Sequence, residues 1–160
     1  MKSDGFTIVE IAITLTIMGI LLVLGVVNLT GSQANGRDAK RKSDVETIAV
    51  HLENYYNSES GEYPPTTFIS SISQYLPDLD TSSIMAPGIS TPADTFKPAA
   101  DVLLAQPTKD EYIYQPISGD GSLCTDSATQ ECRKFNIFYR LEIATDECPG
   151  FVCKVTSKHQ

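Results

Sequence analysis

The chain has 160 residues and a formal net charge of −8, which suits one domain with an anchor and excludes two full domains. From Glu59 onward, 14 acidic residues stand against 7 basic residues, so this part carries a charge of −7. Nonspecific binding to nucleic acid needs a basic surface, so we expect no direct nucleic-acid binding.

An almost continuous apolar run extends from Phe6 to Leu29, interrupted by Glu10, a few threonines, two glycines and Asn28. At about 1.5 Å per helical residue, its roughly 24 residues can cross a hydrocarbon core of ~30 Å. The run is longer than the apolar part of an ordinary secretory signal, and no A-x-A cleavage site follows it. It predicts a transmembrane helix, with an uncleaved signal anchor as the simplest alternative.

The helical pattern continues beyond the apolar run. Apolar residues recur at steps of three and four, as in an amphipathic helix: Val45, Ile48, Ala49, Leu52, Tyr55 and Tyr56. Two glycines weaken the intervening segment, but strong breakers come only at Gly61 and at Pro64-Pro65. We therefore predict one helix from about Phe6 to about Ser58, whose second half packs under a globular head.

The rest of the chain is predicted to form a small head with late strands. Residues 69–76 suit a short helix, and residues 77–107, rich in Pro, Ser, Thr and Asp, predict a long surface loop. Strands are expected at 111–115, 135–143 and 151–155. In the second, one face is apolar: Phe135, Ile137, Tyr139, Leu141 and Ile143. Strands without helices between them indicate an antiparallel sheet, so the fold class is α+β, with the sheet packed on the helical stripe.

All four cysteines lie in the last quarter of the chain: Cys124, Cys132, Cys148 and Cys153. An even number beyond a membrane anchor predicts two disulfides in an oxidising compartment. A zinc site is the alternative, although no C-x₂-C spacing occurs. Of three possible pairings we predict the local ones, Cys124–Cys132 and Cys148–Cys153. A Cys124–Cys153 bridge would instead staple a terminal strand to a loop.

The segment Gly5-Phe6-Thr7-Ile8-Val9-Glu10, followed by the apolar run, closely resembles the processing site of the type IV pilin and type II secretion pseudopilin superfamily. The resemblance continues along the long helix and through residues 61–64. It implies a type IV pilin-like fold and a leader, residues 1–5, that a prepilin peptidase cleaves after Gly5, with N-methylation of Phe6. Many family members have a helix-breaking proline where this sequence has Val27, and Gly25 is the nearest weak point here.

Glu10 places a carboxylate in an apolar segment, which is costly in lipid. Cleavage after Gly5 would give Phe6 a free ammonium, a suitable counter-charge. Within one chain the pair would be strained, because both groups lie on one short helical turn. A neighbouring subunit shifted along the axis can instead bring its Phe6 amine to Glu10. Phe6 and Glu10 are therefore the predicted assembly residues, and a Glu10 that merely lies at the membrane edge is the simpler alternative.

A basic cluster follows the apolar run, comprising Arg37 and the Lys40-Arg41-Lys42 triplet. We interpret it as solvated or facing lipid headgroups. The acidic head of a neighbouring subunit is the alternative partner.

The resemblance implies a structural subunit, the major pilin of an extracellular type IV pilus-like filament that serves adhesion or twitching motility. Its partners would be identical subunits in a homo-oligomer, the prepilin peptidase and an inner-membrane assembly platform. Before assembly it would cross the cytoplasmic membrane once, with its head outside. One alternative is a pseudopilin of a type II secretion or competence (DNA-uptake) machine. Another, from a different class, is a signal-anchored monomeric surface binding protein that keeps residues 1–5.

The implied organisation is a leader (1–5), a transmembrane and polymerisation helix (6–29), an amphipathic second half of the helix (30–58) and a head (59–160). Catalytic patterns such as a phosphate-binding loop or a nucleophile elbow are not found, so we expect neither an enzyme nor a cofactor. Four acidic residues lie in loops near the cysteines and could bind calcium: Asp120, Asp126, Asp146 and Glu147. Their spacing matches no calcium loop, so no metal is expected.

Overall fold

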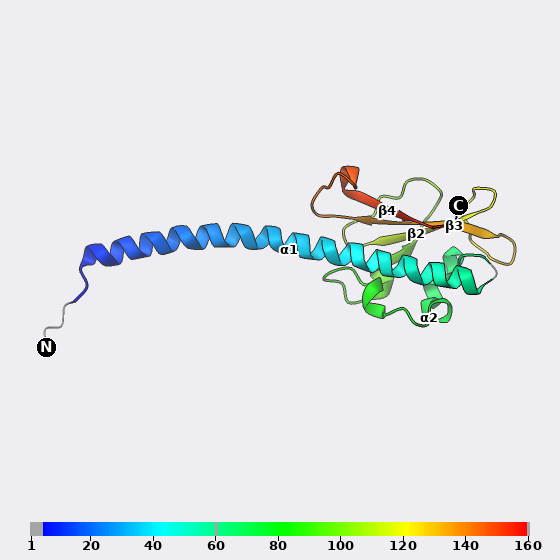
Figure 1. Ribbon diagram of the computed structural model, residues 1–160, viewed down its shortest axis with the longest axis horizontal. Coiled ribbons are helices and arrows are strands. Elements are labelled where there is room, and N and C mark those ends of the chain that lie inside the picture. The colour runs from blue at the N-terminus through cyan, green and yellow to red at the C-terminus, as the bar shows by residue number, and fades with distance from the viewer. Residues whose placement is uncertain (1–4, 60, 160) are drawn as a thin grey trace. The chain divides into compact units, whose positions relative to one another are not determined.

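The computed structural model describes residues 5–59 and 61–159, without the side chains at positions 26–30 and 149. It divides into two compact units, Met1–Gly36 and Arg37–Gln160, which we consider separately. One helix, α1 (Ile8–Ser58), runs from the first unit into the second (Figure 1). The prediction of a single helix ending near Ser58 is thus confirmed. The division falls at Gly36, so the amphipathic part of α1 belongs to the same unit as the head.

The first unit is the apolar part of α1. Ile8–Gly25 is long and apolar enough to cross a membrane, and every side chain in this stretch is exposed. The hydroxyl groups of Thr14 and Thr16 donate to the carbonyls of Ile11 and Ala12, so these polar side chains are satisfied within the helix.

In the second unit, α1 turns its apolar stripe toward a sheet. Val45, Ile48 and Leu52 are fully buried, as the periodicity predicts. The helix ends where Gly61 adopts a positive φ of 82° and its amide donates to the Tyr56 carbonyl at 3.1 Å. Glycine adopts this conformation without the strain that a Cβ would bring.

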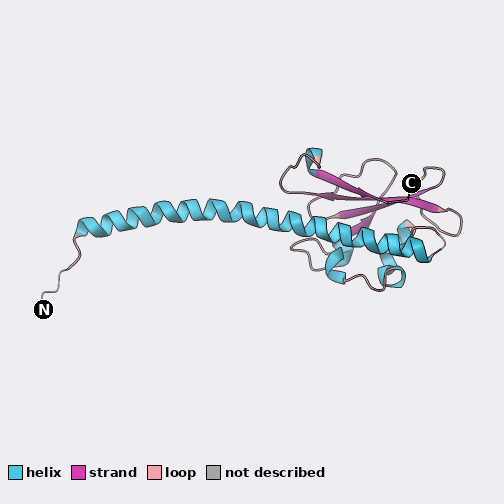
Figure 2. Ribbon diagram, in the orientation of Figure 1, coloured by secondary structure: helices cyan, strands magenta, loops and turns pink. Residues whose placement is uncertain are grey.

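Four strands form the sheet in the order β1-β2-β3-β4 (Figure 2). They are β1 (Phe96–Pro98), β2 (Tyr112–Ser118), β3 (Cys132–Arg140) and β4 (Val152–Thr156). The pairs β2–β3 and β3–β4 are antiparallel, as expected, but β1 pairs with β2 in parallel. The sheet is therefore mixed, and β1 is a strand that the sequence analysis did not find.

The segment 77–107 is more ordered than a surface loop. It contains the 3₁₀ helix η2 (Thr81–Ile84), the short helix α3 (Pro92–Thr95) and strand β1. Ile84, Ala86 and Phe96 are buried in the core. The prediction of a plain surface loop is wrong here, because scattered apolar side chains anchor the segment to the head. Upstream, where one short helix was predicted at 69–76, the structure has a 3₁₀ helix, η1 (Thr66–Ser71), followed by the short helix α2 (Ile72–Tyr75). The 3₁₀ helix η3 (Pro149–Phe151) precedes β4.

Aromatic rings fill the core between α1 and the sheet. Phe68 meets Tyr114 edge to face at 4.9 Å, and Tyr63 meets Phe135 in the same way at 4.9 Å. Such pairs add about 0.5–1.5 kcal/mol each to the gain from burial. The Tyr114 hydroxyl donates to the Pro64 carbonyl, so the buried phenol is satisfied.

The opposite face of the sheet is also covered. Gln115 is buried, and its amide donates to the carbonyls of Asp101 and Leu103, which holds the segment 99–111 in place. Phe138 is buried on strand β3 although it alternates with the predicted core residues. By contrast, Ile143 lies beyond the end of β3 and is exposed, so its assignment to the core is wrong.

Candidate functional site

The start of α1 is closed by a reciprocal pair of side chains, Thr7 and Glu10. The Glu10 carboxylate accepts from the Thr7 amide at 2.9 Å and from the Thr7 hydroxyl at 2.8 Å. The Glu10 amide in turn donates to the Thr7 hydroxyl at 3.2 Å. This is a capping box, in which a hydroxyl residue and an acid three positions later satisfy free amides of the first helical turn.

The capping box gives Glu10 a partner inside its own chain. Thr7 was not predicted as a partner of Glu10, although the Thr-x-x-Glu spacing is itself a known helix-start signal. Gly5 and Phe6 precede the helix, and the Phe6 side chain is 85% exposed. Residues 1–4 of the predicted leader lie outside the described residues. Cleavage after Gly5, N-methylation of Phe6 and pairing between the Phe6 amine and Glu10 stay predictions.

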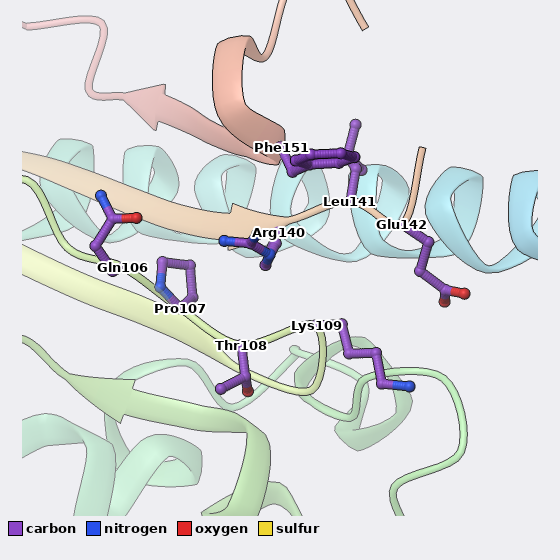
Figure 3. A pocket seen from close by; sticks show the side chains of 8 residues that line it. All are labelled: Gln106, Pro107, Thr108, Lys109, Arg140, Leu141, Glu142 and Phe151. Carbon is purple, nitrogen blue, oxygen red and sulfur yellow. The ribbon is translucent and has the colours of Figure 1, made fainter. Parts of the chain in front are cut away.

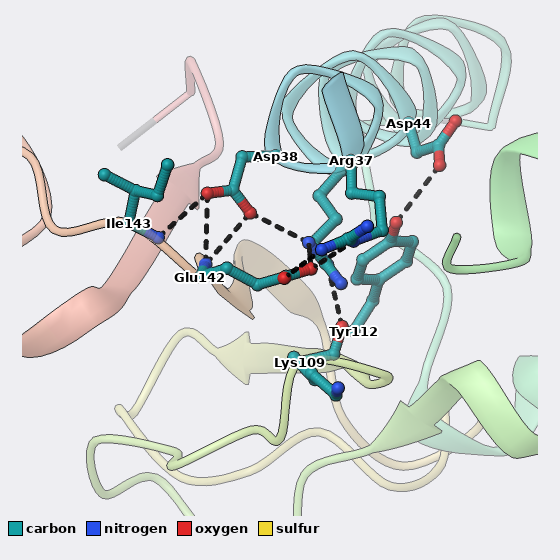
Figure 4. A network of polar contacts seen from close by, with 8 residues as sticks. Arg37, Asp38, Asp44, Lys109, Tyr112, Glu142 and Ile143 are labelled. Atoms are coloured by element: carbon teal, nitrogen blue, oxygen red, sulfur yellow. Dashed lines mark hydrogen bonds and ion pairs between the residues drawn. The ribbon is translucent and has the colours of Figure 1, made fainter. Parts of the chain in front are cut away.

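A second polar site lies in the head, where the first turns of α1 in this unit meet the end of β3 (Figure 4). Arg37 binds the Glu142 carboxylate with two hydrogen bonds, at 2.7 and 2.6 Å. Asp38 accepts from the backbone amides of Glu142 and Ile143 at 2.9 and 3.0 Å. These contacts tie α1 to a segment 104 or 105 residues further along the chain. We call this site the polar clamp.

Arg41 is the buried centre of the polar clamp, with a side chain only 1% exposed. Its guanidinium lies 2.8 Å from carboxylate oxygens of both Asp38 and Glu142, and its Nε donates to the Lys109 carbonyl at 2.8 Å. Burying an unpaired charge is costly, but this guanidinium has two acids and a carbonyl around it. Arg41 therefore also fixes the loop that carries Lys109.

A neighbouring pair extends the polar contacts along α1. The Tyr112 hydroxyl donates to Asp44 at 3.1 Å, and Lys40 lies 2.9 Å from the same carboxylate. Lys40 also donates to the Ser82 carbonyl at 3.2 Å. The basic cluster thus makes contacts within its own head. The interpretation of Arg41 as a solvated or headgroup-facing residue is wrong, because folding buries it and brings the distant Glu142 to it beside the neighbouring Asp38.

The environment sets the charge states of these acids. Hydrogen bonds from Arg37, aided by Arg41, lower the pKa of Glu142 from 4.5 to about 2. Burial raises the pKa of Asp44, against the effect of Lys40 and Tyr112. Burial also raises the pKa of Tyr112, and Asp44 adds to this shift. Glu142 is therefore a firmly ionised anchor of the clamp at neutral pH.

The cysteines form two local bridges, Cys124–Cys132 and Cys148–Cys153, which is the pairing expected from the sequence. Because all four sulfurs are engaged, the zinc alternative is wrong. Among the described residues, no group of three or more His, Cys, Asp or Glu side chains could hold a metal ion. Asp120 instead accepts from the Ser122 amide at 2.9 Å, which closes the turn after β2.

Comparison with known proteins gives two relatives. The chain is 32% identical to the type II secretion system core protein G of Aeromonas hydrophila over 65 residues, which is 41% of this chain and 45% of that protein. It is 34% identical to the core protein G of Dickeya chrysanthemi over 65 residues, 41% of this chain and 42% of that protein. The chain therefore spans less than half the length of these curated relatives.

No family model and no solved structure matches the chain. The fold adds to the sequence matches, because a long N-terminal apolar helix and a small four-stranded sheet give an α+β architecture of the pilin type. Over the matched residues the chain is similar to type II secretion pseudopilins, and together with this architecture the matches support the type IV pilin and pseudopilin superfamily.

Proposed function

We propose that the chain is a pseudopilin, a membrane-anchored subunit that packs through its N-terminal helix into the filament of a secretion machine. Both relatives are named as core proteins of type II secretion systems, which favours this function over the extracellular pilus subunit that the sequence analysis preferred. In this proposal the chain is a structural component without catalytic activity or a cofactor. Its partners are other subunits, a prepilin peptidase and a membrane assembly platform.

The observation that carries the proposal is the exposed apolar surface of Ile8–Gly25. Removing apolar surface from water gains about 25 cal/mol per Å², so a stretch of this length needs a cover. The segment has the length and composition to lie in lipid. In a filament, the same segments of neighbouring copies would provide the cover instead.

The capping box gives Glu10 hydrogen-bond partners both in lipid and in a filament. In the single chain its carboxylate accepts two hydrogen bonds from Thr7, which offsets part of the cost of an acid in an apolar segment. A Phe6 ammonium from a neighbouring copy would add the counter-charge that a hydroxyl and an amide lack. This ion pair would then stabilise one axial register between neighbouring subunits relative to the others.

The function is tested by deleting the gene in its source cell and measuring secreted proteins and surface fibres. A pseudopilin should be required for secretion of folded proteins, while long surface fibres persist. Loss of fibres with normal secretion would identify the pilus subunit instead. A chain that keeps residues 1–5, with neither secretion nor fibres affected by its deletion, would indicate the anchored monomeric binding protein.

Processing gives a direct test at the residue level. Gly5→Leu should leave the full-length precursor in the membrane and prevent filament formation, because a peptidase site that accepts a glycine backbone closely has no room for a branched side chain. Intact mass spectrometry of the membrane and filament fractions measures the cleavage and any added methyl group. Gly31→Leu is the matched control, since Gly31 lies in α1, outside the proposed cleavage site. Filaments that carry an intact Met1 would contradict the assignment.

A further inference from the structure

A groove of about 620 Å³ lies on the head beside the end of β3 (Figure 3). Its walls include Arg140 of β3, Phe151 of η3 and the loop residues 106–109. Phe151 has a positive φ of 71°, which a bulky side chain rarely adopts, and the Cys148–Cys153 bridge closes the turn that holds it. The groove is therefore built from three segments that are separately fixed.

Two cations in this groove have no acidic partner. The Arg140 guanidinium lies over the Phe151 ring, 5.5 Å from its centroid, and Arg41 holds the backbone of Lys109 through its carbonyl. Among the described residues, neither Arg140 nor Lys109 forms an ion pair. Glu142, the acid in the groove wall, is already bound by Arg37 and Arg41. The groove thus presents two cations without an acidic partner to an anion from outside.

The opposite end of the same head is acidic. Glu59 and Glu62 follow the last turn of α1, and the Arg133 guanidinium binds the Gly61 carbonyl, which brings them beside the turn that carries Asp120. Serine and backbone donors lower the pKa of Asp120 to about 2, so this acid stays ionised. Within the described part of the chain, Glu59 and Glu62 form no ion pair. We call Glu59, Glu62 and Asp120, which lie around the Arg133–Glu131 ion pair, the acidic pole.

The groove and the acidic pole cannot meet within one head. The clamp beside the groove holds α1 at Arg37, while the acidic pole begins at Glu59, roughly 33 Å further along the helix at about 1.5 Å per residue. Ion pairs form over a few ångströms, and salt screens exposed charges beyond ~8–10 Å. The two complementary surfaces are thus available only to different molecules.

We propose that the groove binds the acidic pole of a second copy of this chain, so that heads stack head to tail along the filament. The inference rests on the proposed function, in which all copies point the same way because each begins in the membrane. An interface between two unlike surfaces repeats without closing, which is the requirement for a filament rather than a dimer. Arg140 and Lys109 would then set the head-to-head register, separately from the packing of the apolar helices.

The test places a photo-crosslinking residue at Thr108, an exposed position in the groove, in the full chain assembled in its source cell. The expected product is a crosslinked dimer whose second peptide comes from 59–62 or 119–131. Arg140→Gln with Lys109→Gln should lower the crosslink and the filament yield at least about fivefold, since paired charges across an interface steer and fix association. Lys42→Gln is the matched control, because Lys42 is an exposed cation of α1 that belongs neither to the groove nor to the acidic pole.

Each outcome separates this inference from the proposed function. Filaments of the double variant at wild-type yield, or a crosslink to another region of the second copy or to another protein, would overturn the inference and leave the function intact. A crosslink to phospholipid in the membrane fraction would identify an anionic headgroup as the ligand and also overturn it. Failure of the unmodified chain to form filaments at all would overturn the proposed function. Thermal unfolding of the solubilised variants checks that the head still folds.

Discussion

The two halves of α1 form one helix but differ in burial. From Ile8 to Gly25 every side chain is exposed, whereas from Arg37 onward one face carries fully buried residues such as Val45, Ile48 and Leu52. The apolar face of the second half is buried within its own chain, against the aromatic rings of the head and beside the polar clamp. The first half is apolar all round and leaves its burial to a partner or to lipid. The difference predicts that substitutions in the two halves act on different equilibria, assembly in one and folding in the other.

The largest expected effect is on assembly. Glu10→Ala should reduce filament yield at least about tenfold, because an unpaired buried ammonium on a neighbouring Phe6 costs several kcal/mol. Head unfolding should not change, since the Glu10 contacts are with Thr7. Thr14→Ala, which also removes a polar group that bonds within the helix, is the control and should assemble normally. Filament yield against membrane-pool level decides this, and a large fall in the melting temperature of the head would contradict the division between the halves.

The next effect is on folding and lies in the polar clamp. Arg41→Met should destabilise the head by about 3 kcal/mol, because it leaves buried carboxylate groups short of a partner. Lys42→Met is the matched control: the side chain is 54% exposed and its contact with Glu147 is 3.5 Å, so a change within about 0.5 kcal/mol is expected. Urea unfolding of the solubilised chain, followed by near-ultraviolet circular dichroism, measures both. If Arg41→Met and Lys42→Met destabilised the head equally, the buried ion pairs of Arg41 would make no special contribution to its stability.

Smaller effects are expected from the disulfides, which constrain the head without contributing to the first half of α1. The bridged cysteines are separated by 8 and 5 positions. For loops of this size, replacing either bridge by two serines should lower the free energy of unfolding of the head by about 2–2.5 kcal/mol. Non-reducing peptide mapping checks the pairing, and unfolding of each double variant checks the size. Recovery of a Cys124–Cys153 peptide would overturn the observed pairing.

The smallest predicted effect is a pH dependence. Because the pKa of Glu142 is lowered to about 2 in the folded head, its contribution is complete above its ordinary pKa of 4.5 and is lost as the pH falls from there toward 2. The loss should be about 1–2 kcal/mol, since part of the side chain still meets solvent. Asp44 acts in the opposite direction, because its pKa is raised. Glu142→Gln should flatten the acid limb of the stability profile, and Glu147→Gln, at an exposed acid, should leave it unchanged.

The sequence predicts those parts of the fold that depend on regular spacing. The helical stripe through Leu52, the ladder of Phe135, Ile137 and Tyr139, and the end of α1 before Gly61 are all found where expected. Strand β1 was not foreseen because it has only three residues and a proline, and it becomes a strand through pairing with β2. Phe138 is buried although it alternates with the predicted core residues of β3, and no local pattern predicts burial on both faces of this strand.

The candidate sites show the same limit. The spacing of Thr7 and Glu10 is typical of a capping box, so this contact could have been predicted from the sequence. The burial of Arg41 could not be predicted, since a cation in a basic cluster is usually solvated and Glu142, one of its two acidic partners, comes from another part of the chain. Arg140 is at an outward position of a strand, and only the folded head places Phe151 and Lys109 beside it. Contacts between residues that are close in sequence are predictable from their spacing, whereas contacts that tertiary structure brings together are not.

The polar clamp and the strand after it also constrain the order of events during biogenesis. Asp38 binds amides 104 and 105 residues downstream, and Glu53 binds the Lys158 amide 105 residues downstream. Contacts between such distant segments form late and slowly. A chain made from its N-terminus, with α1 first, therefore cannot close its head until Val152–Lys158 is also available. During that interval Arg41 and the apolar stripe lack the side chains that cover them in the folded head.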